Sequence, residues 1–251
     1  LAGFNVLREK ESQPGSLMFR IGGYDLKSLD MEMIRKRYDE EVKKGTLVKE
    51  DFRNNIEGLL TSAGDNIQHV IDADSTTSES NTITNIKGRS SLLKTLRFLR
   101  ELPGCEKTKL LSMQPETGVR ETYRIDGTYK ITREDYISGR IFDDSVCYSF
   151  YPIDLHDKNG VVPDHLKDGI VPTIPLRALI PKNSRNFIVA GRCVSSDRMA
   201  NSALRVQASC MAMGQVAGAT AALANKLNKT PLDIPIDTIK SLLSDHKAIV
   251  P

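Results

Sequence analysis

The sequence has little excess charge, no paired cysteine motif and none of the common catalytic signatures. Its formal net charge is +3, which is too small to indicate binding to nucleic acid. Its four cysteines include no Cys-x-x-Cys pair, so neither a zinc site nor a disulfide framework is predicted. This cysteine usage favours a reducing compartment, and we expect a cytoplasmic protein.

Short motifs for several reaction classes are also missing. The sequence contains no His-Glu-x-x-His, no Gly-x-Ser-x-Gly and no P-loop, so metal, serine-hydrolase and nucleoside-triphosphate chemistry have no motif behind them. A Gly-x-Gly-x-x-Gly fingerprint is absent as well. The chain begins at Leu1 without a methionine and shows no signal peptide, so we expect it to be a piece of a longer protein.

What is present is the composition of an ordinary globular protein, with 39% hydrophobic and 27% charged residues. The spacing of apolar residues predicts helices over residues 29–45 and 90–103, and a last helix from about Asp237 to about His246. The polar stretch that starts at Asp74 is interpreted as a loop, and the middle third of the chain as β structure. These patterns together predict an α+β, or mixed α/β, fold.

One change in composition suggests a boundary. It comes near Asn186, just after an extended connection that is punctuated by prolines and ends at Pro181. We therefore divide the chain into residues 1–181 and residues 182–251.

The segment after this boundary has the pattern of a strand followed by a loop and a helix. Phe187–Ala190 is apolar on both alternate sides, which is typical of a strand buried in the middle of a sheet. From Val206 to Asn225 nothing is charged, and alanine and glycine dominate. We expect a helix over about 203–226 that is hidden nearly all round and packs close to its neighbours.

A ligand site is expected between that strand and that helix. In open α/β sheets ligands bind outside the carboxyl ends of the strands. The start of the next helix offers unpaired N–H groups and a positive dipole end, which suit a phosphate or an electron-rich carbonyl. Gly191 permits a tight exit from the strand, and Arg192 and Arg205 flank the loop.

Other interpretations of this segment remain open. Gly214 and Gly218 in an apolar run resemble a transmembrane dimer motif, but the run is rich in alanine and contains glutamine, serine and threonine, so we expect no membrane span. The small residues also suit simple packing of a helix on a sheet. Ser195, Ser196 and Asn201 are equally consistent with ordinary loop residues.

The segment PLRALIPKNSRNFIVAGRCVSSDRMANSALRVQASCMAMGQVAGATAALA closely resembles the carboxyl-terminal part of a family of FAD-dependent oxidoreductases. That family belongs with the two-dinucleotide-binding-fold flavoproteins, distantly like the flavoprotein subunits of fumarate reductase. GVRETYRIDGTYKITREDYISGRIFDDSV and YPIDLHD resemble its middle region. The resemblance implies FAD as cofactor, a small-molecule substrate, and hydride or electron transfer at flavin N5.

The same resemblance implies a role for each part of the chain. Residues 1–181 would form a β-rich substrate-binding region, packed on residues 182–251 as part of a Rossmann-like FAD unit. Gly191 and Arg192 would lie against the pyrophosphate or ribityl part of FAD. The pyrimidine edge of the flavin ring would face Ser202, Ala203, Leu204, Arg205 and Val206. Because the family's Gly-x-Gly-x-x-Gly segment is missing, we expect a fragment that binds FAD poorly by itself and lacks activity.

Two side chains in the substrate region are candidates for chemistry. His156 would donate a proton or anchor a substrate oxygen, unless it is a loop histidine held by Asp154 or Asp157. Arg120, with Arg124 on the same face of a strand, would bind a carboxylate.

Two alternatives to these assignments stay open. The arginines of the strand are also consistent with a solvated face that pairs with Glu116 and Glu121. The alternative to an enzyme is a non-catalytic binding or assembly module that recognises an acidic ligand or partner.

Overall fold

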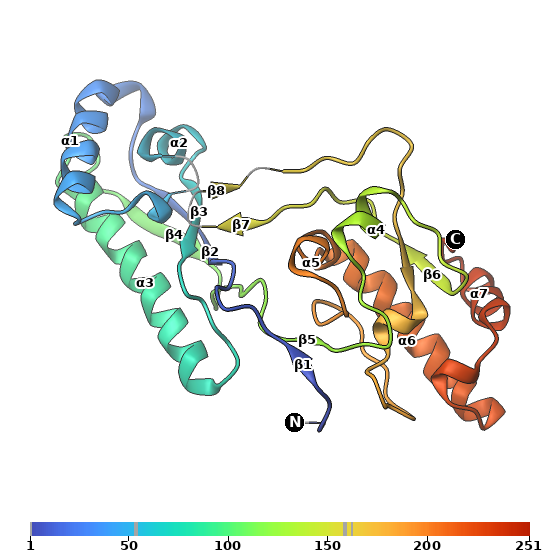
Figure 1. Cartoon of the computed structure of the whole chain (residues 1–251). Helices are drawn as coiled ribbons and strands as arrows, with labels where there is room; N and C mark the ends of the chain where they lie inside the picture. Colours follow the sequence, from blue (N-terminus) through green and yellow to red (C-terminus); the bar gives the residue numbers. More distant parts are fainter. Residues whose placement is uncertain (1, 53–54, 158–159, 162) are drawn as a thin grey trace. The chain divides into compact units, whose positions relative to one another are not determined.

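A computed structural model of the chain describes residues 2–52, 55–157, 160–161 and 163–251. The chain divides into two compact units, whose elements are labelled in Figure 1. We call Glu11–Arg120 the sheet unit, and Leu1–Lys10 with Glu121–Pro251 the helix-pair unit. Helices and strands occur in both units, so the prediction of a mixed α+β fold is confirmed.

The sheet unit is built on a three-stranded antiparallel sheet in the order β3-β2-β4. Its strands are β2 (Gly15–Gly22), β3 (Asp65–Val70) and β4 (Lys109–Met113). Buried and more exposed residues alternate along β2, because successive side chains point to opposite faces of a strand. Phe19 and Ile21 therefore enter a core that also holds Ile34, Leu59 and Leu96 from three helices.

These three helices are α1 (Met31–Lys44), α2 (Ile56–Thr61) and α3 (Ser78–Arg100), with single 3₁₀ turns η1 (Leu26–Ser28) and η2 (Lys49–Asp51). The expected helix near 29–45 is confirmed. Asp30 accepts a hydrogen bond from Met33 N, and Gly45 ends the helix at φ 76°. Glycine is favoured at that position because a Cβ disfavours left-handed backbone.

The third helix is longer than its apolar pattern predicts. It begins at Ser78 rather than near residue 90, so most of the polar stretch interpreted as a loop is helical. Thr77 and Ser80 form a reciprocal cap, with hydrogen bonds of 3.0 and 3.1 Å. In the first half of α3, buried polar side chains are hydrogen-bonded: Thr84 Oγ1 donates to Asp74 O at 2.9 Å, and Asn85 Oδ1 accepts from Thr117 N at 2.8 Å. Hydrogen bonding therefore replaces the apolar stripe that sequence patterns detect.

The helix-pair unit contains three small two-stranded antiparallel sheets. Their paired strands are β1 (Val6–Leu7) with β5 (Arg124–Ile125), β6 (Ser145–Tyr148) with β9 (Thr173–Pro175), and β7 (His156–Asp157) with β8 (Gly160–Val161). Its other elements are α4 (Arg133–Ile137), η3 (Leu176–Leu179), α5 (Arg198–Leu204), α6 (Gln207–Leu227), η4 (Pro231–Asp233) and α7 (Ile236–Asp245).

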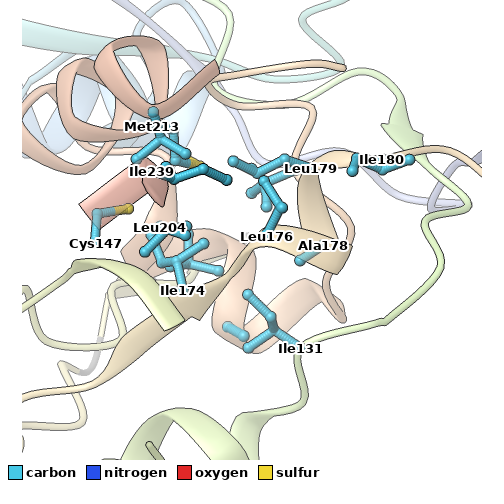
Figure 2. Close-up of a cluster of buried hydrophobic side chains, with 14 of the residues drawn as sticks. Ile131, Cys147, Ile174, Leu176, Ala178, Leu179, Ile180, Leu204, Met213 and Ile239 are labelled. Carbon is cyan, nitrogen blue, oxygen red and sulfur yellow. The ribbon is translucent and has the colours of Figure 1, made fainter. Parts of the chain in front are cut away.

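The core of this unit crosses the boundary that the sequence suggested. Ile174 and Leu176 pack in one buried cluster with Leu204, Met213 and Ile239 from the helices (Figure 2). The compact units divide instead at Lys10/Glu11 and Arg120/Glu121. The change in composition near Asn186 therefore marks no division between compact units, because strand β9 supplies one side of the core that α6 and α7 complete.

The strand predicted at Phe187–Ala190 does not form. These residues have no assigned secondary structure, and Val189 N donates a hydrogen bond to Leu179 O at 2.8 Å. In the described ranges the sheets pair antiparallel, and the parallel contact recorded is an isolated bridge between Ile131 and Ser196. Apolar composition favours a strand, but a central strand also needs hydrogen-bonding neighbours on both edges, and this segment lacks them here.

The helix expected over 203–226 is two helices. Asp197 caps α5 by accepting from Ala200 N, and α6 begins only at Gln207, after an extended Val206. The helix α6 is not hidden all round either. Ser209, Met213 and Val216 are buried, but Met211 is 68% exposed, and open space surrounds Gly214 and Gly218. Within the described ranges, none of the helices has the length and apolar character that crossing a membrane requires.

The reciprocal cap of α3 can be tested by a single substitution. We expect Thr77→Ala to lower the free energy of unfolding by about 1 kcal/mol, because the backbone N–H of Ser80 loses its side-chain acceptor. Thr82→Ala, on the exposed side of the same helix, should be neutral or slightly stabilising, since alanine has the higher helix propensity. Urea denaturation measures both changes. Equal effects at the two positions would show that the cap contributes nothing.

Candidate functional site

The loop that follows the predicted strand leaves open space beside its glycine. Gly191 has φ 98°, a conformation that side chains rarely adopt, and a Cβ built there would meet no atom within 4 Å. The loop is fixed from behind, because Asn201 Nδ2 of α5 donates to Arg192 O at 3.1 Å. Asn201 is fully buried, and its Oδ1 has no hydrogen-bond partner. This glycine therefore combines a conformation it favours with room for a ligand in front of it.

The start of α6 has no side chain that caps its first N–H groups. Its first residue is preceded by Val206, whose side chain has no polar atom to cap the helix, and the first turn contains no acidic residue. The helices α1 to α5 each have a side-chain cap, and α7 has Asp237 in its first turn. No N-cap side chain therefore accepts from the first N–H groups of this 21-residue helix, and its first turn contributes no carboxylate.

The five residues predicted to face a flavin ring divide by burial. Ser202, Ala203 and Leu204 lie in α5 and are fully buried, and Ala203 and Leu204 belong to the core cluster. Arg205 and Val206 follow α5 and are partly exposed. The structure thus shows packing roles for two of the five and leaves the proposed contact of the turn with a cofactor as a prediction.

Asp154 joins the predicted catalytic residue to this turn. Its Oδ2 lies 3.2 Å from His156 Nε2 and 3.5 Å from Arg205 Nη2. Its main chain adds two contacts: Asp154 N donates to Ser202 Oγ at 3.1 Å, and Arg205 Nη2 donates to Asp154 O at 3.1 Å. The side chains of Asp154, His156 and Arg205 are mostly buried, with exposed fractions between 11% and 19%. One carboxylate therefore holds His156 beside the end of α5.

Sequence reasoning treated Asp154 only as a possible holder of a loop histidine. The structure shows a wider role, since the same carboxylate also contacts Arg205. The contact of Asp154 with His156 was indicated by the sequence, because residues i and i+2 lie on the same face of an extended chain. The contact with Arg205 crosses 51 positions in the sequence and has no local signal.

The charge of the buried Arg205 guanidinium is stabilised by the carboxylate of Asp154. Burial lowers the pKa of Arg205, and the carboxylates of Asp154 and Glu121 act in the opposite direction. Glu121 is itself buried, with Arg198 Nε at 3.5 Å and Arg124 Nη1 at 3.8 Å from its carboxylate. The region is thus a partly buried network of alternating charges, in which removing one member leaves its neighbour uncompensated.

The two arginines predicted to share a face of one strand belong to different units. Arg120 is the last residue of the sheet unit, where its Nη1 donates to Pro14 O. Arg124 lies in β5 of the helix-pair unit and binds Glu9 and Glu121. Arg124 pairs with Glu121 as the alternative expected, but both side chains are buried, so the pair does not lie on a solvated face. His156 also belongs to the helix-pair unit, so the two predicted catalytic residues lie in separate units.

The cysteines and acids supply no metal site. Each of the four cysteines is free, and burial raises the pKa of Cys193, beside the loop glycine, and of Cys147, the latter to about 12. In the part of the chain that the structure describes, no group of three histidine, cysteine or acidic residues is placed to hold a metal ion.

Comparison with known proteins gives one finding. A family described as FAD dependent oxidoreductase matches residues 2–243, which is nearly the whole chain. No curated protein and no solved structure matches.

The coupling between Asp154 and Arg205 can be measured directly. We expect Asp154→Asn to lower the free energy of unfolding by about 3 kcal/mol, because a mostly buried guanidinium loses its carboxylate. Asp154→Asn combined with Arg205→Met should recover at least about 1 kcal/mol of that loss, since the uncompensated charge is gone.

An exposed pair in the same unit serves as the control for this cycle. Arg133 and Asp164 are 37% and 41% exposed, and Asp164→Asn should cost less than about 1 kcal/mol. Denaturant titration of each variant gives the values. Strict additivity of the Asp154 and Arg205 changes would mean that the two side chains are not coupled.

Proposed function

The chain belongs to the family of FAD-dependent oxidoreductases, and on that premise we propose that it forms the substrate-binding and carboxyl-terminal part of a flavoenzyme. Membership supports flavin-dependent redox chemistry in general. The proposed reaction moves a hydride or an electron pair between a small organic substrate and the flavin. The observation that carries the proposal is the open space at Gly191, and the uncapped start of α6 supports it.

The residues at this place fit FAD. Gly191 leaves room for a group to approach the main chain closely, and Arg192 is an exposed cation next to it. The first N–H groups of α6 suit the electron-rich edge of a flavin ring, because a helix N-terminus stabilises negative charge. When bound, FAD supplies the centre that accepts or releases the hydride. The residues of the chain then bind the cofactor and the substrate and orient them.

His156 and Arg205 have distinct proposed tasks. Asp154 fixes the His156 ring through Nε2, so that the ring is held in one orientation from which it gives a proton to, or takes one from, the substrate. Arg205 keeps a positive charge near the start of α6, and Asp154 and Glu121 offset the cost of burying it. Arg120 is proposed to bind a carboxylate of the substrate. Ser202 sets the main chain at Asp154, and Ala203, Leu204 and Val206 complete the turn.

The chain by itself is proposed to bind FAD weakly and to be inactive. Flavoproteins of the two-dinucleotide-binding-fold type hold the adenosine half of FAD on a Gly-x-Gly-x-x-Gly turn at a helix N-terminus, and the sequence has no such turn. Most of the contact surface for the cofactor would then come from an amino-terminal extension of the same polypeptide. That extension would be the partner of the 251 residues described here.

The test is the visible spectrum of the protein purified with its natural amino-terminal extension. We expect the absorbance of oxidised flavin in the extended protein and little or none in the 251-residue chain. Arg192→Gln in the extended protein should raise the Kd for FAD about tenfold, because a charged contact to the pyrophosphate is lost. Arg185→Gln, at an exposed arginine of the preceding segment, is the matched control and should leave the Kd unchanged.

The opposite results are equally informative. A folded, colourless extended protein that takes up no added FAD would reject the enzyme and favour a non-catalytic binding module. Equal affinities for FAD in the Arg192 and Arg185 variants would reject the contact with the pyrophosphate while leaving FAD binding itself intact.

A further inference from the structure

A groove lies on the helix-pair unit, and its lining includes Ala208 and Ser209 in the first turn of α6, next to the turn assigned to flavin. Its volume is about 910 Å³, which is in the range of pockets that hold small molecules. Small residues of α6, among them Ala208 and Ala212, form one wall. The residues around β6 and before β9 form another, and the chain that follows α7 closes the end.

The groove gathers large apolar side chains that are unusually exposed. Ile141 is 75% exposed, Phe150 68%, Val171 44% and Ile249 83%, and all four line the same groove. Single exposed apolar residues are common on protein surfaces, but a cluster in a concave site marks a place where apolar material is taken up. A ligand in the groove would remove these side chains from water.

One charged residue lines the groove among those that the structure describes, and it has an unusual backbone. Lys247 follows the C-cap of α7 with φ 64°. Lys247 N donates to Ser244 O at 2.9 Å, and Ala248 N to Leu243 O at 3.0 Å. This pair of bonds is the helix-ending motif in which glycine is strongly preferred, since a side chain strains left-handed backbone.

The lysine therefore occupies a position where it weakens the fold. Asparagine and aspartate tolerate left-handed backbone better, and they account for three of the other four non-glycine residues with positive φ: Asp72, Asn183 and Asn228. Lysine lacks the short polar side chain that makes left-handed backbone tolerable for asparagine and aspartate. What it adds is an exposed ammonium group at the edge of an apolar groove.

We propose that this groove binds an amphipathic monocarboxylate, a molecule with one carboxylate on an aliphatic or aromatic body. The body lies against Ile141, Phe150, Val171 and Ile249, and the carboxylate accepts a charge-assisted hydrogen bond from Lys247 Nζ. The inference needs no flavin. Failure of the flavin proposal leaves it standing, and its own failure leaves the flavin proposal standing.

Isothermal titration calorimetry with the 251-residue chain tests the proposal, with dodecanoate below its micelle concentration as the probe. We expect saturable binding of one molecule per chain. Affinity should rise about threefold for each CH₂ from octanoate to dodecanoate, because each added group is buried. Dodecyltrimethylammonium, with the same tail and the opposite charge, should bind at least about tenfold more weakly.

Substitutions in the groove separate charge from apolar contact. Lys247→Gln and Phe150→Ser should each weaken dodecanoate binding about tenfold, and both residues are exposed, so the fold is not at risk. Lys229→Gln, at an exposed lysine beyond the end of α6 that does not line the groove, should bind as the parent does.

The left-handed lysine allows a second and independent readout. Lys247→Gly should abolish the preference for carboxylate and at the same time raise Tm by about 1–3 °C, because the backbone strain is relieved. A variant that is more stable but has lost the preference for carboxylate would show that Lys247 serves ligand binding at a cost in stability. If Lys247→Gly lowered Tm, the lysine would be explained by stabilisation of the helix end, and the proposal would be overturned.

Three other outcomes would overturn it as well. They are equal affinity for dodecanoate and the cationic amphiphile, unchanged binding in Lys247→Gln, and no binding together with a monomer–dimer equilibrium that Phe150→Ser shifts toward monomer. The last would identify a second copy of the chain as the occupant of the groove.

Discussion

The contact between the carboxylate of Asp154 and the guanidinium of Arg205 is the interaction on which the candidate site depends. Arg205 lies between two helices, and Asp154 precedes the histidine proposed for catalysis by two residues. Because both charges are mostly buried, each is tolerable only in the presence of the other. The carboxylate of Asp154 therefore links His156, in β7, to the turn before α6.

The helix α6 brings three properties together in one element. Its buried side, with Met213 and Val216, completes the core of the helix-pair unit. Its start has no side-chain cap and no acidic residue in the first turn, and its exposed side of small residues borders a groove. A larger or charged residue at the exposed positions would fill that surface. The small and uncharged composition is thus required on the open side as well as on the packed side, which is why the sequence alone suggested a helix hidden all round.

Sequence patterns predicted those elements whose signals are local. The helix over 29–45 and the last helix both follow from residues within one or two turns of each other. The long helix α3 was only half predicted, because its first half is buried through hydrogen bonds of polar side chains such as Asn85. The strand at Phe187–Ala190 was wrong for the opposite reason: its apolar pattern is real, but a strand exists only with partners, and partners are not a local property.

The candidate site shows the same limit. The sequence identified His156, Gly191 and the turn before α6, yet it gave no indication that one carboxylate would join the first of these to the last. Two local preferences are broken at the ends of helices: an apolar residue precedes α6 where a polar cap is preferred, and a lysine follows α7 where glycine is preferred. Each departure weakens the fold slightly and leaves a polar group facing open space. Selection for stability alone would remove both, so the two helix ends are where function is to be sought in this chain.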